Sequence, residues 1–225
     1  MADWYPLFRY AHLLAFVYWL GADLGVFYAA RHAARPDLSV AERRRFLRLT
    51  LLLDMGPRTG LILVVPTGFT LAIAGGWLPA EMRLVGLVWI AGLAWLALTW
   101  WLYLAEGKSA WIEPWRLVDL GIRLAVIAFF AGAAIAALAG YGPLHARWLA
   151  LKALLYAAVV GIGVMLRLLL ADWLRGMRLV ESGEDVALGN GLVELAARRA
   201  ERWALLLWLL VAGIALLGVV QPSLR

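Results

Sequence analysis

The sequence contains no cysteine among its 225 residues. This absence excludes disulfide bonds, thiolate metal sites and cysteine catalysis. Charged residues are also scarce, at 16%, whereas a soluble domain carries about a quarter. Hydrophobic residues make up 64% of the chain. These proportions indicate an integral membrane protein in contact with the lipid bilayer.

Three recognisable motifs are missing as well. The N-terminus lacks the basic region and the A-x-A site of a cleaved signal peptide, so we expect its first apolar run to persist as a transmembrane helix. No H-E-x-x-H zinc motif occurs, and no helix carries a histidine pair suited to bis-histidine haem. The net charge of +6 lies in short loops beside apolar runs, which indicates membrane topology and not nucleic-acid binding.

Six apolar stretches are long enough to cross a bilayer core, which takes about 20 residues of helix. They predict an all-α bundle forming one transmembrane domain over residues 1–225, with helices near 5–30, 48–75, 82–105, 115–140, 147–173 and 200–220. Ser39 and Glu42 have the spacing of a capping box and predict a helix start there. The stretch 181–191 is expected to be the longest polar connection.

Arginine placement predicts the orientation. Arginines concentrate after the first and fifth predicted helices and are few after the second and fourth. The positive-inside rule then places the loops after the first, third and fifth helices in the cytoplasm, with both termini outside. The expected location is the bacterial cytoplasmic (inner) membrane.

A short pattern recurs along the chain. Asp54 and Arg58 flank Gly56, and Asp119 and Arg123 flank Gly121. Each Asp lies 21 residues before a glycine that ends its helix, at 75 and 140. This spacing indicates a parallel repeat of a helical hairpin, with coincidence in a sequence rich in Leu, Ala and Gly as the alternative.

Asp and Arg four residues apart lie on one helix face and can form an ion pair. Charges at membrane depth face the bundle interior or a water-filled cavity. Two interpretations remain open: the pairs fix helix packing, or they handle a ligand or a proton. The predicted orientation places a network of buried charges in the cytoplasmic half: Asp23, Asp54, Arg58, Asp119, Arg123, Arg167 and Asp172.

The outer half holds Arg9, His12, Arg147 and Lys152. His12 and Lys152 are expected at similar depth. Lys152 is one of only two lysines, and a buried lysine can change its protonation state where arginine cannot. His12 could ligate haem iron or a metal through a neutral imidazole nitrogen. The alternatives are a hydrogen-bonded packing histidine and a lysine whose ammonium reaches the membrane surface.

Two segments resemble a known family. The stretch 10–21, Tyr-Ala-His-Leu-Leu-Ala-Phe-Val-Tyr-Trp-Leu-Gly, is similar to the first helix of the HemJ-type protoporphyrinogen oxidases and CopD-like membrane proteins. The stretch 148–155, Trp-Leu-Ala-Leu-Lys-Ala-Leu-Leu, is similar to that family's W-L-x-x-K-L-x-L segment. An additional hairpin, roughly 82–140, separates the two matched parts.

The resemblance implies a membrane-embedded oxidoreductase associated with haem b. It makes His12 the axial ligand of the haem iron and Lys152 its catalytic companion. Lys152 with Arg9 or Arg147 would neutralise haem propionates or an anionic substrate. The substrate would be a porphyrin or a quinol-like molecule entering from the lipid.

Two other functions compete with this one. The first is a permease for copper or a small solute, favoured by helix interruptions at Gly56-Pro57 and at Pro66-Thr67-Gly68, with a simple helix kink at these residues as the alternative. Scattered methionines argue against copper, because Cu(I) prefers soft ligands. The second is a non-catalytic subunit of a membrane complex or homo-oligomer, packing through the small residues Ala131, Gly132, Ala133, Ala134 and Ala137.

Overall fold

The computed structural model describes residues 4–81, 83–106, 111–142, 144 and 146–222. Every regular element in these ranges is a helix, which confirms the predicted all-α class. The helices are α1 (Tyr5–Ala33), α2 (Val40–Leu53), α3 (Met55–Ala74), α4 (Arg83–Leu104), α5 (Ile112–Leu138), α6 (Arg147–Ser182) and α7 (Val186–Val220).

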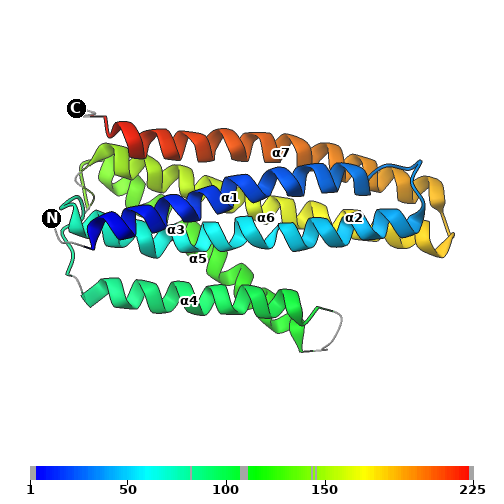
Figure 1. The fold of residues 1–225 in the computed structure, drawn as a ribbon, viewed down its shortest axis with the longest axis horizontal. Helices are drawn as coiled ribbons and strands as arrows, with labels where there is room; N and C mark the ends of the chain where they lie inside the picture. The colour runs from blue at the N-terminus through cyan, green and yellow to red at the C-terminus, as the bar shows by residue number, and fades with distance from the viewer. Residues whose placement is uncertain (1–3, 82, 107–110, 143, 145, 223–225) are drawn as a thin grey trace.

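The seven described helices form six segments that are long and apolar enough to cross a membrane, with α2 and α3 together forming the second span. The chain is therefore a polytopic helical membrane protein, as its composition predicts. Figure 1 shows both termini at one end of the bundle, as an even number of crossings requires.

Helix lengths divide the bundle into a membrane part and an extension at one end. The 22 residues of α4 span about 33 Å, close to the thickness of a bilayer core. The 36 residues of α6 and 35 of α7 reach more than about 50 Å. Figure 1 shows α2, α6 and α7 continuing past the end of α4.

This extension corrects the predicted boundaries of the last two helices. The polar stretch 181–191 is not a long connection, because α6 runs to Ser182 and α7 begins at Val186. Asp185 caps α7 by accepting a hydrogen bond from the Leu188 N–H at 2.9 Å. Gly189, Val193 and Ala197 recur at helical spacing and are buried. Apolar residues three or four apart support a helix even where the mean polarity is high.

Proline has different effects at two positions in the second span. Pro57 provides no N–H for the Leu53 carbonyl, and its ring crowds that carbonyl. The boundary between α2 and α3 accordingly falls at Asp54. Asp54 itself keeps helical backbone angles (φ −62°, ψ −17°), so the broken helix predicted near Gly56-Pro57 is only a local irregularity in one continuous span. The interruption predicted at Pro66 is wrong, because α3 continues through Pro66 to Ala74.

The ends of α3 and α5 are built alike. The Trp77 N–H donates to the Ala72 carbonyl at 2.9 Å, and the Tyr141 N–H donates to the Ala136 carbonyl at 2.8 Å. The glycine before each aromatic residue, Gly76 or Gly140, has a positive φ that other residues rarely adopt. The equivalent of Gly140 is thus Gly76 and not Gly75, so the repeat is out of register by one residue at this end.

Two apolar clusters hold the helices together. The membrane cluster contains Trp19, Ile62, Val159 and Val211, among others, from α1, α3, α6 and α7. The extension cluster joins α1, α2, α6 and α7 through Ala33, Leu47, Trp173, Met177, Val193, Ala196 and Ala197. In this second cluster a side chain at Gly176 would meet the Gly189 carbonyl at 2.7 Å, so α6 and α7 are in close contact there.

The predicted orientation can be tested by cysteine labelling, because the parent chain has no cysteine to give a background signal. Asp37 lies between α1 and α2, and Glu81 lies between α3 and α4. We expect a membrane-impermeant maleimide to label Glu81→Cys in intact cells and Asp37→Cys only after lysis. The opposite pattern would reverse the orientation.

Candidate functional site

A cavity of about 180 Å³ lies between the membrane cluster and the extension cluster. Trp19, Leu61 and Val159 line it from one side, and Leu47 and Trp173 from the other. Its walls come mainly from α1, α2, α3, α6 and α7. Helix α5 contributes only Arg123, and α4 contributes no described residue. The cavity is mostly apolar, with charged side chains at several points of its wall.

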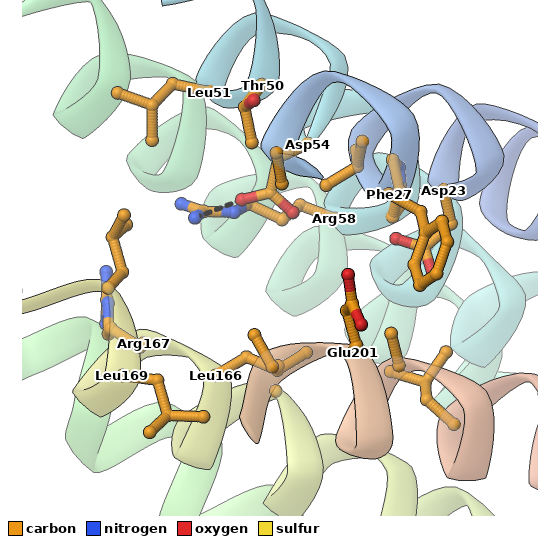
Figure 2. Close-up of a pocket in the computed structure, with 18 of the residues that line it drawn as sticks. Asp23, Phe27, Thr50, Leu51, Asp54, Arg58, Leu166, Arg167, Leu169 and Glu201 are labelled. Carbon is orange, nitrogen blue, oxygen red and sulfur yellow. Dashed lines mark ion pairs between the residues drawn. The ribbon is translucent and has the colours of Figure 1, made fainter. Parts of the chain in front are cut away.

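Asp54 and Arg58 occupy the wall at the junction of α2 and α3. They form the i, i+4 ion pair that their spacing predicts, and both side chains are partly buried. Asp54 is the residue between α2 and α3, and Arg58 lies in the first turns of α3, so the pair sits at the junction of the two helices. Figure 2 shows Arg58 and Asp54 on one side of the cavity and Arg167 approaching from α6.

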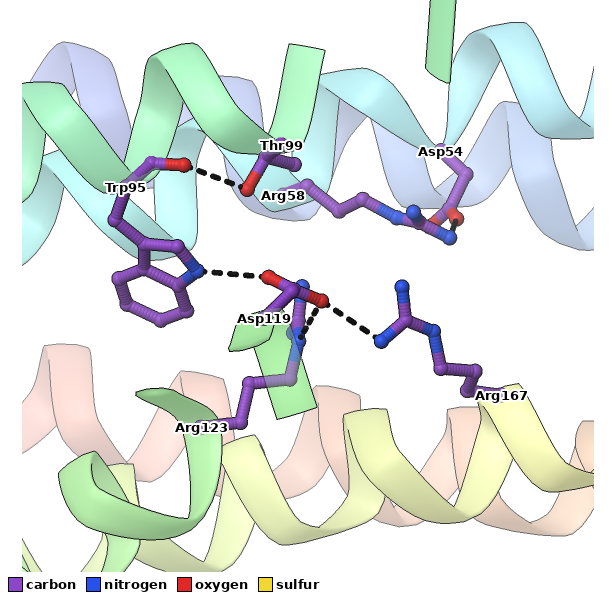
Figure 3. Close-up of polar contacts among 7 residues, drawn as sticks. All are labelled: Asp54, Arg58, Trp95, Thr99, Asp119, Arg123 and Arg167. Atoms are coloured by element: carbon purple, nitrogen blue, oxygen red, sulfur yellow. Dashed lines mark hydrogen bonds and ion pairs between the residues drawn. The ribbon is translucent and has the colours of Figure 1, made fainter. Parts of the chain in front are cut away.

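Asp119 on α5 is the centre of a second group (Figure 3). Its Oδ2 accepts hydrogen bonds from Arg123 Nε at 3.0 Å and from an Arg167 guanidinium nitrogen at 2.7 Å. Its Oδ1 accepts one from Trp95 Nε1 at 2.9 Å. Asp119 is 1% exposed. The predicted pair with Arg123 is confirmed, and Arg167 and Trp95 extend it across α4, α5 and α6.

Two more carboxylates reach the cavity from the α1 and α7 side. Asp23 accepts a hydrogen bond from Trp208 Nε1 at 2.7 Å. Glu201 on α7 pairs with Arg31 at 3.2 Å. Figure 2 shows the Glu201 carboxylate directed across the cavity toward the Asp54–Arg58 side. Sequence reasoning missed Glu201, although its position between Ala197 and Ala204 on one helix face gives a signal.

The structure does not unite all the predicted site residues. Asp172 is exposed, so its place in the buried network is wrong. Its neighbour in the sequence, Trp173, is buried in the extension cluster instead. Arg9 and Arg147, proposed as anion-neutralising partners of Lys152, are both exposed as well.

His12 and Lys152 lie in the other half of the bundle, away from the cavity lining. They are within electrostatic range of each other, as their predicted depth implies. The Lys152 ammonium lies 5.8 Å from the centre of the Trp148 ring. A side chain at Gly218 of α7 would meet the same ammonium at 2.7 Å. These contacts place the ammonium group of Lys152, a residue of α6, against α7.

The Thr67 hydroxyl determines the tautomer of His12. This hydroxyl donates to the Leu63 carbonyl at 2.6 Å, so its hydrogen is already used. It lies 2.8 Å from His12 Nδ1 and must accept from an Nδ1–H. A neutral His12 therefore keeps its lone pair on Nε2, the nitrogen free to bind iron or accept a proton.

Within the described ranges, no group of three or more His, Asp or Glu side chains could hold a metal ion. The cavity wall, which has no histidine in its described part, also lacks an axial ligand for haem. Ala134, in the stretch of small residues on α5, is fully buried in the bundle, whereas Gly132 is exposed.

Three guanidinium groups and two carboxylates form the charged network beside the cavity. Arg58 pairs with Asp54, while Arg123 and Arg167 share Asp119. Among these five groups one positive charge is in excess, before Asp23, which lines the same cavity, is counted. Arg58 and Arg167 are close enough to repel each other. A charge buried without a counter-ion is costly in a membrane, so this arrangement suits a bound anion.

The fold and this site define a class: a helical membrane protein with a charged cavity between its helices. No family model, no curated protein and no solved structure matches the chain.

Asp119→Asn should destabilise the protein by about 3–5 kcal/mol, because the buried guanidinium of Arg123 and the partly buried one of Arg167 would lose their counter-ion. The free energy of unfolding in mixed micelles measures this effect. Glu194→Gln removes a carboxylate from an exposed pair with Arg198 and should change the stability by less than about 1 kcal/mol. Equal effects of the two substitutions would contradict a stabilising role for the buried network.

Proposed function

We propose that the protein is a permease that binds a small organic monoanion in the cavity between the two apolar clusters. The observation that supports this most is that Arg58, Arg123 and Arg167 all line one cavity but have only two paired carboxylates between them, Asp54 and Asp119. Arginine guanidinium groups bind carboxylates through paired, charge-assisted hydrogen bonds. The anionic group would lie between Arg58 and Arg167.

The apolar remainder of the wall defines the rest of the solute. Phe27, Leu51, Leu166 and Leu169 line the cavity together with the charged groups. Its volume of about 180 Å³ compares with the roughly 150 Å³ of an engineered protein cavity that binds benzene. An aromatic or short aliphatic carboxylate meets both requirements.

The interruption of the second span supports transport in particular. Transporters place solute sites where a membrane helix is broken, because the broken segment can move and its polar groups can reach the solute. Here the α2–α3 junction at Asp54, where Pro57 offers no N–H to the Leu53 carbonyl, borders the cavity as an irregularity of this kind on a smaller scale. We further propose the bacterial cytoplasmic membrane as its location, with the extension on the cytoplasmic side as the arginine distribution predicts.

Benzoate and its neutral isostere benzamide provide the test. Isothermal titration of the purified protein should show binding of benzoate and none of benzamide. Arg167→Gln should weaken benzoate binding about tenfold or more, since a hydrogen bond to a charged group contributes about 1.5–3 kcal/mol. Arg167→Lys keeps the charge and should retain part of the affinity.

Arg175→Gln is the matched control, because Arg175 is an exposed arginine on the same helix. It should bind benzoate like the parent protein, and uptake of labelled benzoate into proteoliposomes should follow the same order of variants. Equal binding of benzoate and benzamide, or no binding by the folded parent protein, would overturn the proposal.

The haem-b redox function that the family resemblance implies is the second candidate. One observation favours it: the hydrogen bond with Thr67 leaves Nε2 of His12 available to iron. This nitrogen suits an axial ligand of haem iron, but the surroundings of His12 do not suit a buried porphyrin. The described cavity is lined by residues remote from His12, and the side chain of His12 packs directly against Gly68. A porphyrin would therefore have to lie on the outside of the bundle.

An absorption spectrum distinguishes this candidate. If His12 binds haem, the protein purified from haem-supplied cells has a Soret band that His12→Ala abolishes. His32→Ala should keep the band, because His32 is an exposed histidine on the same helix. A colourless parent protein would exclude the haem function and leave the anion site unaffected.

A further inference from the structure

Asp23 differs from the other carboxylates that line the cavity. Asp54 pairs with Arg58, and Glu201 pairs with Arg31. Among the described residues, Asp23 has no cationic partner within ion-pair distance, and its side chain is bound by the Trp208 indole. An indole N–H donates a hydrogen bond but supplies no full positive charge.

Every helix around the cavity places a charged group toward this space. These groups are Arg31 on α1, Asp54 at the α2–α3 junction, Arg58 on α3, Arg123 on α5, Arg167 on α6 and Glu201 on α7. Asp54 is near enough to interact electrostatically with Asp23, and it has the same sign. The carboxylates other than Asp23 each have an arginine partner, so the protonation state of Asp23 is the least constrained.

The charge balance of the cavity depends on that protonation state. With Asp23 ionised, four arginines meet four carboxylates: Asp23, Asp54, Asp119 and Glu201. The network is then neutral and has no need of an anion. With Asp23 protonated, one positive charge is in excess, and a monoanion restores neutrality.

We propose that Asp23 is a proton-binding site coupled to the anion site, so that a monoanion enters the cavity together with a proton on Asp23. This inference rests on the proposed function and specifies how it is regulated. The proton comes from bulk water and binds a carboxylate oxygen, and no covalent bond of the solute changes.

The contact with Trp208 is compatible with both states. Trp208 Nε1 donates to Oδ2 of Asp23, and that oxygen can accept a hydrogen bond whether or not Oδ1 carries a proton. The Trp208 ring packs against Phe27 with ring centres 5.2 Å apart. Asp23 can therefore gain or lose its proton while its indole partner stays in place.

Benzoate affinity measured against pH tests the coupling. One proton taken up per anion makes the affinity fall by up to about tenfold per pH unit on the alkaline side of the Asp23 titration. We expect this fall in the parent protein between about pH 5.5 and pH 9, the range open to a buried carboxylate. Asp23→Asn imitates the protonated state and should bind benzoate with an affinity independent of pH.

Two variants serve as controls. Glu194→Gln removes an exposed carboxylate from α7 and should keep the pH dependence of the parent protein. Trp208→Phe removes the indole donor. The pH range over which the benzoate affinity falls should then shift, since the ionised carboxylate loses its hydrogen bond.

The outcomes separate this inference from the proposed function. A parent protein that binds no benzoate at any pH contradicts the anion site itself. Benzoate binding that is independent of pH in the parent protein, or that keeps its pH dependence in Asp23→Asn, overturns only the role of Asp23. Loss of all binding in a folded Asp23→Asn protein also overturns it, because the neutral side chain should favour the anion.

Discussion

A carboxylate inside a bilayer has no water to solvate it, and Asp119 is stable there because donors from three helices converge on it. Trp95 reaches it from α4, Arg123 from its own helix and Arg167 from α6. Its hydrogen bond from Trp95 is one of the contacts that attach α4 to the rest of the bundle. Asp119 also holds the guanidinium of Arg167 at the cavity wall, so the site depends on the same contact as the fold.

Other tryptophan side chains of α4 also donate hydrogen bonds to a neighbouring helix. Trp89 donates to the Thr70 hydroxyl and Trp100 to the Thr59 hydroxyl, both on α3. An indole combines a large apolar surface with a single donor, which lets it bind a neighbouring helix without placing a charge in the lipid. The helix that packs least against the bundle is thus joined to it by polar contacts from three indoles.

The cavity exists because the bundle changes its composition along its length. In the membrane cluster, buried residues of α1, α3, α4, α6 and α7 pack together. In the extension, α1, α2, α6 and α7 pack around another. Between them lies the α2–α3 junction at Asp54, and α4 contributes no described residue to the wall. The two apolar clusters therefore lie on either side of the cavity, and the charged groups lie around the cavity itself.

The sequence alone determined the number of crossings, since six apolar stretches each need a bilayer to bury them. It also determined the pairs Asp54–Arg58 and Asp119–Arg123, because a spacing of four residues places two side chains on one helix face whatever the helix packs against. Hydropathy misjudged the charged parts of α6 and α7, where buried residues such as Val193 alternate with exposed arginines. It also included Asp172 in a network that its side chain does not face.

Only the tertiary structure decided that Arg167 shares Asp119, that Asp23 lacks an arginine, and that Glu201 belongs to the cavity. These relations join residues on different helices. They depend on how each helix is rotated and where it crosses its neighbours, which the packing of the two apolar clusters sets. The spacing of residues along one helix contains no information about that rotation. The charge balance of the cavity follows from the rotation.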